Sequence, residues 1–256
     1  MKRNPIRRAF IVVVVFVTTM LASCGQYHGL PFGGMNGRVQ KVTMWHLMPE
    51  MWYAGNHGSD IMYITASVYD VYGHEICSAV MDSTEFIQAE AESMYDGDVC
   101  IRSIQKAGNK TMARINLVSK KRGTLEYSKE MNGRTVRMMV KESSFGRRHK
   151  SVVTEDGKVT TESVVVTDRD GYPVKITTIE YETGNKTVET NMFDENHNIT
   201  EKHVVTYYGE DGTEEEEITY IDYGGMDEYG NWTDCRTYNK FRLPVEVLFR
   251  EFEYWE

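Results

Sequence analysis

Short runs in which apolar and polar residues alternate recur along most of the chain, and turn-forming residues separate them. In the first half, these runs cover residues 39–46, 61–69, 74–81, 99–105, 111–118, 124–129 and 134–142. Alternation over this length is typical of β-strands that cover one face of a sheet. Asn109, Gly123 and Asn132-Gly133 lie between the later runs, and Asn-Gly is the strongest short hairpin signal. We therefore predict a β-rich N-terminal body over residues 38–145.

One stretch of this body has a different pattern. In "DSTEFIQAEAESMY", Asp82 is followed three residues later by Glu85, which matches a capping box at the start of a helix. The apolar residues that follow recur at helical spacing. We expect one short helix near residues 83–94.

Residues 146–256 repeat a simpler pattern. Turn glycines, with an asparagine-histidine in place of one of them, fall at positions 157, 171, 184, 197, 212 and 230. This spacing predicts an antiparallel β-meander with internal repetition. No leucine occurs between Leu125 and Leu243, which indicates a thin sheet with one modestly apolar face. The predicted fold is mainly β, an extended meander sheet, and the apolar segment 241–254 is expected to cover one face or close an edge.

The chain begins with a different kind of segment. Four basic residues precede an apolar run over 9–22, which is shorter than the roughly 20 residues of a spanning helix but suits a secretory signal. The run ends in Leu21-Ala22-Ser23-Cys24, which resembles the lipobox of bacterial lipoproteins. That resemblance implies removal of residues 1–23 and acylation of Cys24. The glycine-rich stretch that follows, to residue 37, is then a flexible tether.

The net charge of the chain and the residue after Cys24 indicate where the protein is located. Removing residues 1–23 deletes four cations and no acid, so the net charge changes from −9 to −13. Nucleic acid is not an expected partner of an exported protein with this charge. In some Gram-negative lipoproteins an aspartate after the cysteine signals inner-membrane retention, whereas Gly25 stands here. The resemblance therefore implies an outer-membrane anchor, and the absence of an acidic cluster behind Cys24 favours the periplasmic leaflet.

Several turns share one sequence pattern: an aromatic residue, Asp, two variable positions, Gly, then a polar residue. Residues 69–74 ("YDVYGH") match it closely, residues 193–198 ("FDENHN") carry His in place of Gly, and residues 226–231 ("MDEYGN") carry Met in place of the aromatic. These turns resemble the tyrosine-aspartate (YD or Rhs-type) repeats of bacterial secreted and surface proteins, and the overall plan is similar to Bacteroidetes lipoproteins with such repeats. The resemblance implies a structural role without catalytic residues. In such turns the carboxylate caps backbone amides and the glycine accepts a positive φ.

Motifs for catalysis or metal binding are not found in the sequence. The histidines form neither HxxxH nor HExxH, and no serine lies in GxSxG. Asp194, Asn196 and Asn198 begin like an EF-hand loop, but Ile199 and Val205 replace its glycine and glutamate. We predict no catalytic residue, metal ligand or cofactor. A hydrolase with an unrecognised site is the weakest alternative.

The remaining cysteines allow one disulfide in an oxidising envelope. Cys77 and Cys100 flank the predicted helix and are the expected pair, although spacing alone does not establish it. Cys235 would then be left over.

Two features indicate binding. Residues 102–150 carry a net charge of +11, which either pairs with neighbouring acidic strands or forms a basic face for an anionic lipid or glycan. That face would contain Arg114, Lys120, Lys121, Arg122, Arg147 and Arg148. Three aromatic residues lie in or beside "HLMPEMWYAGNHG", namely Trp45, Trp52 and Tyr53, and they either stack on a ligand or pack as satellite core. The expected function is a lipid-anchored, non-catalytic envelope scaffold or binding surface, with a glycan, a lipid or a protein as partner.

Overall fold

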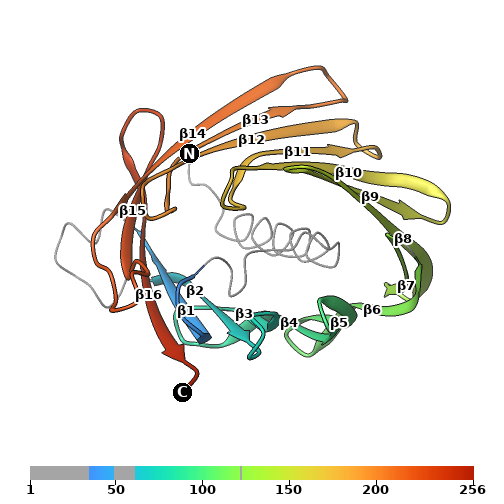
Figure 1. The fold of residues 1–256 in the computed structure, drawn as a ribbon, viewed down its shortest axis with the longest axis horizontal. Helices are drawn as coiled ribbons and strands as arrows, with labels where there is room; N and C mark the ends of the chain where they lie inside the picture. The colour runs from blue at the N-terminus through green and yellow to red at the C-terminus, as the bar shows by residue number, and fades with distance from the viewer. Residues whose placement is uncertain (1–34, 49–60, 122) are drawn as a thin grey trace.

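The structure is a computed structural model that describes residues 35–48, 61–121 and 123–256. Within these ranges the chain forms antiparallel strands and no helix (Figure 1). No helix among the described residues is long and apolar enough to cross a membrane. In chain order the strands are β1 (Val39–Leu47), β2 (Ile61–Tyr69), β3 (Glu75–Met81), β4 (Ile87–Asp96), β5 (Val99–Ala107), β6 (Lys110–Lys121), β7 (Thr124–Met131), β8 (Arg134–Phe145), β9 (Arg148–Glu155), β10 (Lys158–Thr167), β11 (Pro173–Glu180), β12 (Asn185–Phe193), β13 (Ile199–Tyr207), β14 (Glu214–Tyr223), β15 (Asp234–Tyr238) and β16 (Pro244–Tyr254).

The sheet is a closed barrel, which corrects the prediction of an extended meander sheet. Each strand pairs with the next in sequence, and β16 returns to pair with β1. In that closing pair Val42 lies opposite Phe252 and Met44 lies opposite Arg250. The meander order was predictable from local patterns. Closure was not, because it depends on pairing between the two ends of the chain, which removes both sheet edges.

The predicted helix near residues 83–94 is also wrong. Asp82 starts a tight turn in which Glu85 has φ of 64°, and strand β4 follows from Ile87. Ala89 and Ala91 on this strand are buried, whereas Glu90 between them is not, so the burial has a period of two. The same acidic turn chemistry that suggested a helix cap closes a hairpin here.

Six turns share one hydrogen-bond pattern, and it is the pattern expected for the YD-like motifs. In each, the side-chain Oδ1 of the first residue accepts bonds from the backbone amides two and four residues later, at 2.8–3.1 Å. The first residues are Asp70, Asp82, Asp168, Asp194, Asp227 and Asn239. The fourth residue has a positive φ, and it is glycine in three turns and His197 in the 194 turn. The predicted capping role of the aspartates is thereby confirmed.

The barrel has two rims that differ in which turns they contain. The N-terminal rim, as we call it, holds the start of β1, the end of β16 and every turn that follows an even-numbered strand. The opposite rim holds the described turns after odd-numbered strands, from β3 onward. Strands from both halves of the sequence belong to this one barrel, and the boundary proposed at residue 145 falls in the turn between β8 and β9.

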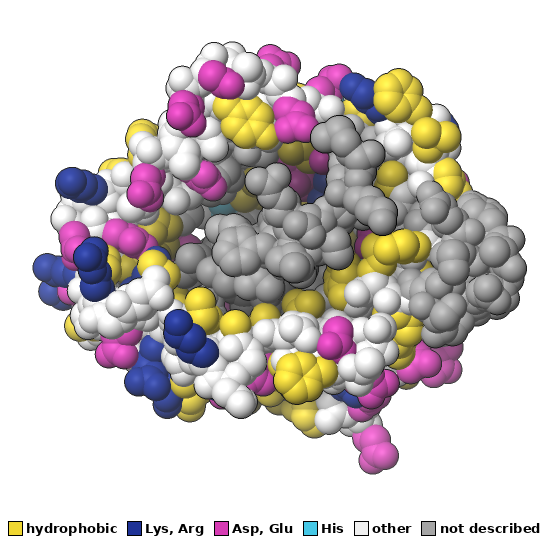
Figure 2. All heavy atoms as spheres, turned by 180° about the vertical axis from the view of Figure 1, so that it is seen from behind, with side chains coloured by type: hydrophobic (Ala, Val, Ile, Leu, Met, Phe, Trp, Pro, Cys, Tyr) yellow, Lys and Arg dark blue, Asp and Glu magenta, His cyan; other side chains and the backbone are white. Residues whose placement is uncertain are grey.

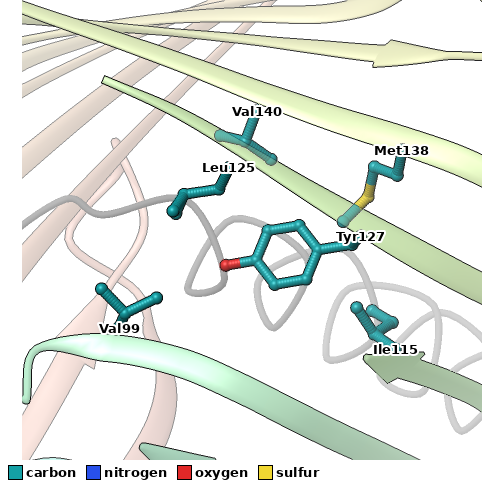
Figure 3. Close-up of a cluster of buried hydrophobic side chains, with 6 residues drawn as sticks. All are labelled: Val99, Ile115, Leu125, Tyr127, Met138 and Val140. Atoms are coloured by element: carbon teal, nitrogen blue, oxygen red, sulfur yellow. The ribbon is translucent and has the colours of Figure 1, made fainter. Parts of the chain in front are cut away.

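The buried apolar residues of β7 and β8 line the inside of the barrel, whereas Leu47, Ile64 and Val247 are buried on the opposite face of the wall, beside Trp45. Leu125 lies opposite Val140 and Tyr127 opposite Met138, so these four side chains share one face of β7 and β8. Figure 3 shows them converging with Val99 of β5 and with Ile115. Side chains from separate parts of a curved wall meet only on its concave side. This face of the wall is therefore the inner face.

Candidate functional site: the inner wall of the barrel

The outer face of the barrel carries paired charges. Cross-strand partners share a face, so the alternation that turns Leu125 inward turns Glu126 outward. Figure 2 shows acidic and basic side chains around the periphery. Outward ion pairs join Lys41 to Glu253 (2.7 Å), Lys106 to Glu90 (2.9 Å) and Glu92 (2.8 Å), Arg137 to Glu126 (2.6 Å), and Lys150 to Glu162 (2.7 Å). The charge pairing that the sequence suggested between basic and acidic strands is present.

The inner face of β1–β8 is mostly apolar. It contains Val42, Val80, Ala89, Ala91, Ala113, Ile115, Leu125, Tyr127, Met138 and Val140, all of which are buried. One ion pair also lies inside: Lys129 and Glu155 are 2.6 Å apart, and the Lys129 side chain is 7% exposed. Burial raises the pKa of Glu142 to about 7. The inner face therefore combines an apolar wall with a few buried polar groups.

Two inner-face side chains, those of Gln105 and Glu142, contain buried polar atoms without a hydrogen-bond partner among the described residues. Both amide atoms of Gln105 are buried without a partner, as is Oε1 of Glu142. Gln105 lies between Ala91 and Ala113 on the inner face. An unpaired buried polar atom costs about 1–3 kcal/mol, so such atoms are favourable places for a bound polar group.

A cavity of about 160 Å³ lies on the inner face, where β1, β2 and β16 meet near the N-terminal rim. It is lined by Met35, Val42, Met44, Thr65, Ser67, Tyr69 and Arg250. Met44 lies opposite both Thr65 and Arg250, which places the three side chains on the same face. The lining thus combines apolar side chains, two hydroxyls and one cation.

Arg250 is the charged group of this cavity. Its guanidinium lies 3.4 Å from the ring centre of Trp232 and 4.9 Å from that of Phe252, and its Nε donates to the Trp232 carbonyl at 3.1 Å. Burial lowers the pKa of Arg250 to about 10. Among the described residues, no carboxylate lies within 4.0 Å of it. Arg250 is therefore a cation held by aromatic rings instead of by an acid.

The turn at residues 226–232 connects this site to the N-terminal segment. The Asn36 amide donates to Oδ1 of Asn231 at 2.6 Å, and Nδ2 of Asn231 donates to the Asn36 carbonyl at 2.9 Å. The same Nδ2 also contacts the Tyr254 hydroxyl at 2.8 Å, and that hydroxyl donates to Asp227. The turn therefore fixes the chain just before β1 to the N-terminal rim.

A group of polar side chains surrounds His46, which lies on β1 farther from the N-terminal rim than the cavity residues Val42 and Met44. Nδ1 of His46 is 2.7 Å from Glu246, its Nε2 is 3.3 Å from the Thr65 hydroxyl, and its ring stacks on Tyr63 at 4.0 Å. The order hydroxyl, imidazole, carboxylate is that of a hydrolytic triad. However, β2 is paired on both sides, so the ladder takes up its backbone amides, which would be needed to stabilise an oxyanion. The geometry therefore does not support a nucleophilic hydrolase at Thr65.

The structure separates the predicted basic residues. Arg114 lies in the middle of the outer face, 3.6 Å from Glu130. Lys120 and Lys121 end β6, and Arg147 and Arg148 lie at the turn between β8 and β9, so both pairs are at the N-terminal rim. All four are exposed. Arg122 lies outside the described residues.

The predicted aromatic loop is only partly described. Trp45 lies on β1, opposite Ile64 and Phe249 and therefore on the outer face. Trp52 and Tyr53 lie outside the described residues, as does Cys24. Trp45 thus does not line the cavity, whereas its neighbour Met44 does.

The expected disulfide between Cys77 and Cys100 is not formed. None of the three described cysteines is in a disulfide. Cys77 is on β3 and Cys100 on β5, with β4 between them. Two strand spacings amount to about 9–10 Å, beyond the reach of a disulfide. The prediction failed because the intervening segment is a strand and not a helix.

One group of potential metal ligands is present at the N-terminal rim. Ligand atoms of Asp168, Asp170 and His197 lie within 4.8 Å of one another. Oδ1 of Asp168 already accepts two backbone amides, and the His197 ring stacks on Tyr172 at 4.1 Å. These contacts account for the group as turn structure.

Four residues of this cavity were not predicted from the sequence: Arg250, Tyr69, Met44 and Thr65. Arg250 lies in "VLFREFEY", where a single cation interrupts an apolar alternation on the inward register. That interruption is the signal that could have identified it. The remaining residues have ordinary strand patterns, and only closure of the barrel brings them together.

Known proteins resemble this chain only distantly. No protein-family model and no curated protein matches the chain. A porin-like protein from Bacteroides uniformis is 10% identical with a TM-score of 0.48, covering 85% of this chain and 99% of that chain. A porin-like protein from Bacteroides vulgatus is 10% identical with a TM-score of 0.44, covering 85% and 98%. At this level neither match assigns a family or a function.

Proposed function

We propose that the protein is a lipid-anchored protein of the outer membrane whose barrel faces water and binds an apolar ligand on its inner wall. It acts as a non-catalytic carrier or receptor. The observation that carries this proposal is the distribution of polarity across the wall of β4–β8: paired charges outside and buried apolar side chains inside. A bilayer-spanning barrel needs the reverse distribution.

The outer face argues against a wall that is itself in lipid. A transmembrane barrel presents an apolar band about 25 Å tall. On β4 the outward positions are Gln88, Glu90, Glu92 and Met94. The outward positions of β12 run from Lys186 through Val188 and Thr190 to Met192, so their apolar stretch spans only about 13 Å. An Arg or Lys on the lipid face costs about 2–4 kcal/mol at the bilayer midplane, and many strands here carry one.

The N-terminal rim would face the membrane if Cys24 carries the lipid. Met35 is part of the cavity lining, and the chain from Cys24 to Met35 spans at most about 40 Å when extended. The exposed Lys120, Lys121, Arg147 and Arg148 lie at the same rim, where each would gain about 1 kcal/mol near an anionic surface. The mouth of the cavity would then lie within reach of membrane lipids.

The other candidate functions receive less support from the geometry. The basic residues expected to form one anion-binding face are distributed between mid-wall and rim, and Arg114 is paired with Glu130. The hydrolase alternative lacks an oxyanion site at the His46 cluster. Binding on the inner wall therefore replaces the basic outer strands as the favoured binding mode.

The test uses the mature chain, residues 24–256, with Cys24→Ser to remove the acylation site. The neutral apolar dye N-phenyl-1-naphthylamine fluoresces strongly only in apolar surroundings. We expect saturable fluorescence enhancement that is lost in Met44→Trp, which fills the cavity. Thr43→Trp, on the outer face one position earlier, should bind like the parent. Circular dichroism checks that both variants keep their β-structure.

Two results would contradict the proposal. One is a parent protein that shows no saturable enhancement. The other is a folded Met44→Trp variant that binds the dye as well as Thr43→Trp does.

A further inference from the structure

We infer that Arg250 recognises the headgroup of a single-chain amphiphile that carries a negative charge, such as a fatty acid. This inference rests on the proposed function and names the class of ligand. The cavity brings together the two chemistries that such a ligand has. The Arg250 guanidinium faces the same space as Val42 and Met44. Beyond the hydroxyls of β2, the inner face continues to Val80 on β3 and Ala89 on β4.

The Arg250 guanidinium is positioned to bind an anion. Its Nε is used by the Trp232 carbonyl, and no other acceptor among the described residues is bonded to its terminal nitrogens. Trp232 and Phe252 hold the plane of the guanidinium from their ring faces. A planar guanidinium with two open terminal nitrogens is suited to a bidentate bond to a carboxylate or phosphate.

The groups whose charges act on Arg250 are Cys235, Tyr223, Tyr69 and one carboxylic acid, and that acid is not available to neutralise it. That acid is Asp227, which lies beyond ion-pair distance. Its carboxylate accepts the Tyr254 hydroxyl and the amides of Tyr229 and Asn231. A buried cation is costly without a paired anion, so a ligand that supplies the anion gains the most here.

The size of the cavity limits the headgroup. A volume of about 160 Å³ is close to that of an engineered cavity that binds benzene. It accommodates a small headgroup with the first methylenes and not a glycan or a phospholipid headgroup with two chains. Thr65 and Ser67 add two hydroxyls to the lining; that of Thr65 lies 3.3 Å from Nε2 of His46, and that of Ser67 is hydrogen-bonded to Glu75.

The experiment compares a charged probe with its neutral twin on the mature Cys24→Ser chain. Cis-parinaric acid is a fluorescent fatty acid, and its methyl ester lacks only the charge. We expect the acid to bind at least about tenfold more tightly than the ester. Arg250→Met should remove that difference by weakening the acid, whereas Arg250→Lys should retain part of it. Arg137→Met, on the outer face, is the matched control and should change neither.

Competition against bound cis-parinaric acid shows whether the site prefers a carboxylate or a phosphate. Oleic acid and lysophosphatidic acid present a carboxylate and a phosphate, and lysophosphatidylcholine has no net charge. Stronger competition by either anion than by lysophosphatidylcholine supports the inference and identifies the preferred group. Equal competition by all three contradicts it.

The outcomes distinguish this inference from the proposed function. If the parent protein binds acid and ester equally and Arg250→Met changes nothing, the headgroup role is wrong while inner-wall binding stands. If neither probe nor the neutral dye binds, the proposed function itself is wrong. Should Arg250→Met fail to fold, the acid-to-ester ratio of the parent and of Arg250→Lys still decides the question.

Discussion

In this barrel a single polar side chain stabilises each of several turns. A carboxylate or amide oxygen at the first turn position accepts two backbone amides, which would otherwise be exposed to competition from water. Asp227 has an additional role because it also accepts the Tyr254 hydroxyl and orients Asn231. Gly37 is packed so closely against Tyr229 that an added Cβ would lie 3.0 Å from its ring, and its φ is 75°. The turn and the N-terminal segment are thus fitted to each other residue by residue.

Glu142 gives a prediction about pH dependence. Its pKa rises from the ordinary 4.5 to about 7 because of burial, so between these values the folded state binds more protons than the unfolded state. Stability therefore falls as pH rises through this window, and the penalty is complete above it. Glu142→Gln removes the penalty. We expect it to raise Tm by about 2–4 °C at about pH 8 and to leave Tm unchanged at about pH 4.

Thermal unfolding followed by circular dichroism at both pH values is the measurement. Glu155→Gln is an informative comparison because Glu155 is paired with Lys129, so the same change should lower Tm at the higher pH. A Glu142→Gln shift that is equal at both pH values would show that the carboxyl does not titrate abnormally.

At the scale of elements, strands such as β7 present apolar side chains inside the barrel and charged side chains outside. On β7, Leu125 is 3% exposed and faces inward, whereas Glu126 pairs with Arg137 outside. We expect Leu125→Lys to cost about 3 kcal/mol or more of unfolding free energy, because it buries an unpaired charge. Glu126→Leu should change stability by no more than about 1 kcal/mol, since it removes one exposed ion pair.

Urea denaturation of the two variants and the parent measures the difference. The opposite order, with Glu126→Leu the more damaging, would mean that the inner and outer faces have been assigned the wrong way round. The two positions are adjacent on β7, so they differ in the face of the wall and not in their place along the strand.

Strands with alternating polarity were predictable from the sequence, and the one expected helix shows where this reading fails. The runs predicted at 61–69 and 124–129 agree with β2 and β7. In the stretch after Asp82, short-range spacing fitted a helix as well as a strand, because Ala89 and Ala91 are small and carry little signal of periodicity. Pairing with β3 and β5 selects the strand. Tertiary pairing therefore decides such a segment, and the local sequence does not.

At the scale of the whole molecule, closure creates the candidate site. Lys41 and Glu253 are 212 residues apart in sequence and 2.7 Å apart in the barrel. The cavity lies at this same junction, between Met44 and Arg250, and no local pattern predicts a contact over that distance. The sequence could supply the turns, the strands and the expectation of an anchor. The enclosed inner wall and the cavity with Arg250 follow only when β16 meets β1 (Figure 1).

The central claim, that the barrel faces water and only the lipid on Cys24 holds it at the membrane, is tested most directly by ultracentrifugation of detergent-free cell lysates. Wild-type protein and the mature chain with Cys24→Ser, directed to the same compartment by a cleavable secretory signal, are compared by immunoblot. The account predicts wild-type protein in the membrane pellet and the Cys24→Ser chain as a monodisperse species in the supernatant. A Cys24→Ser chain that stays in the pellet until detergent is added, with its β-structure intact, would contradict it and would place the barrel wall itself in the bilayer.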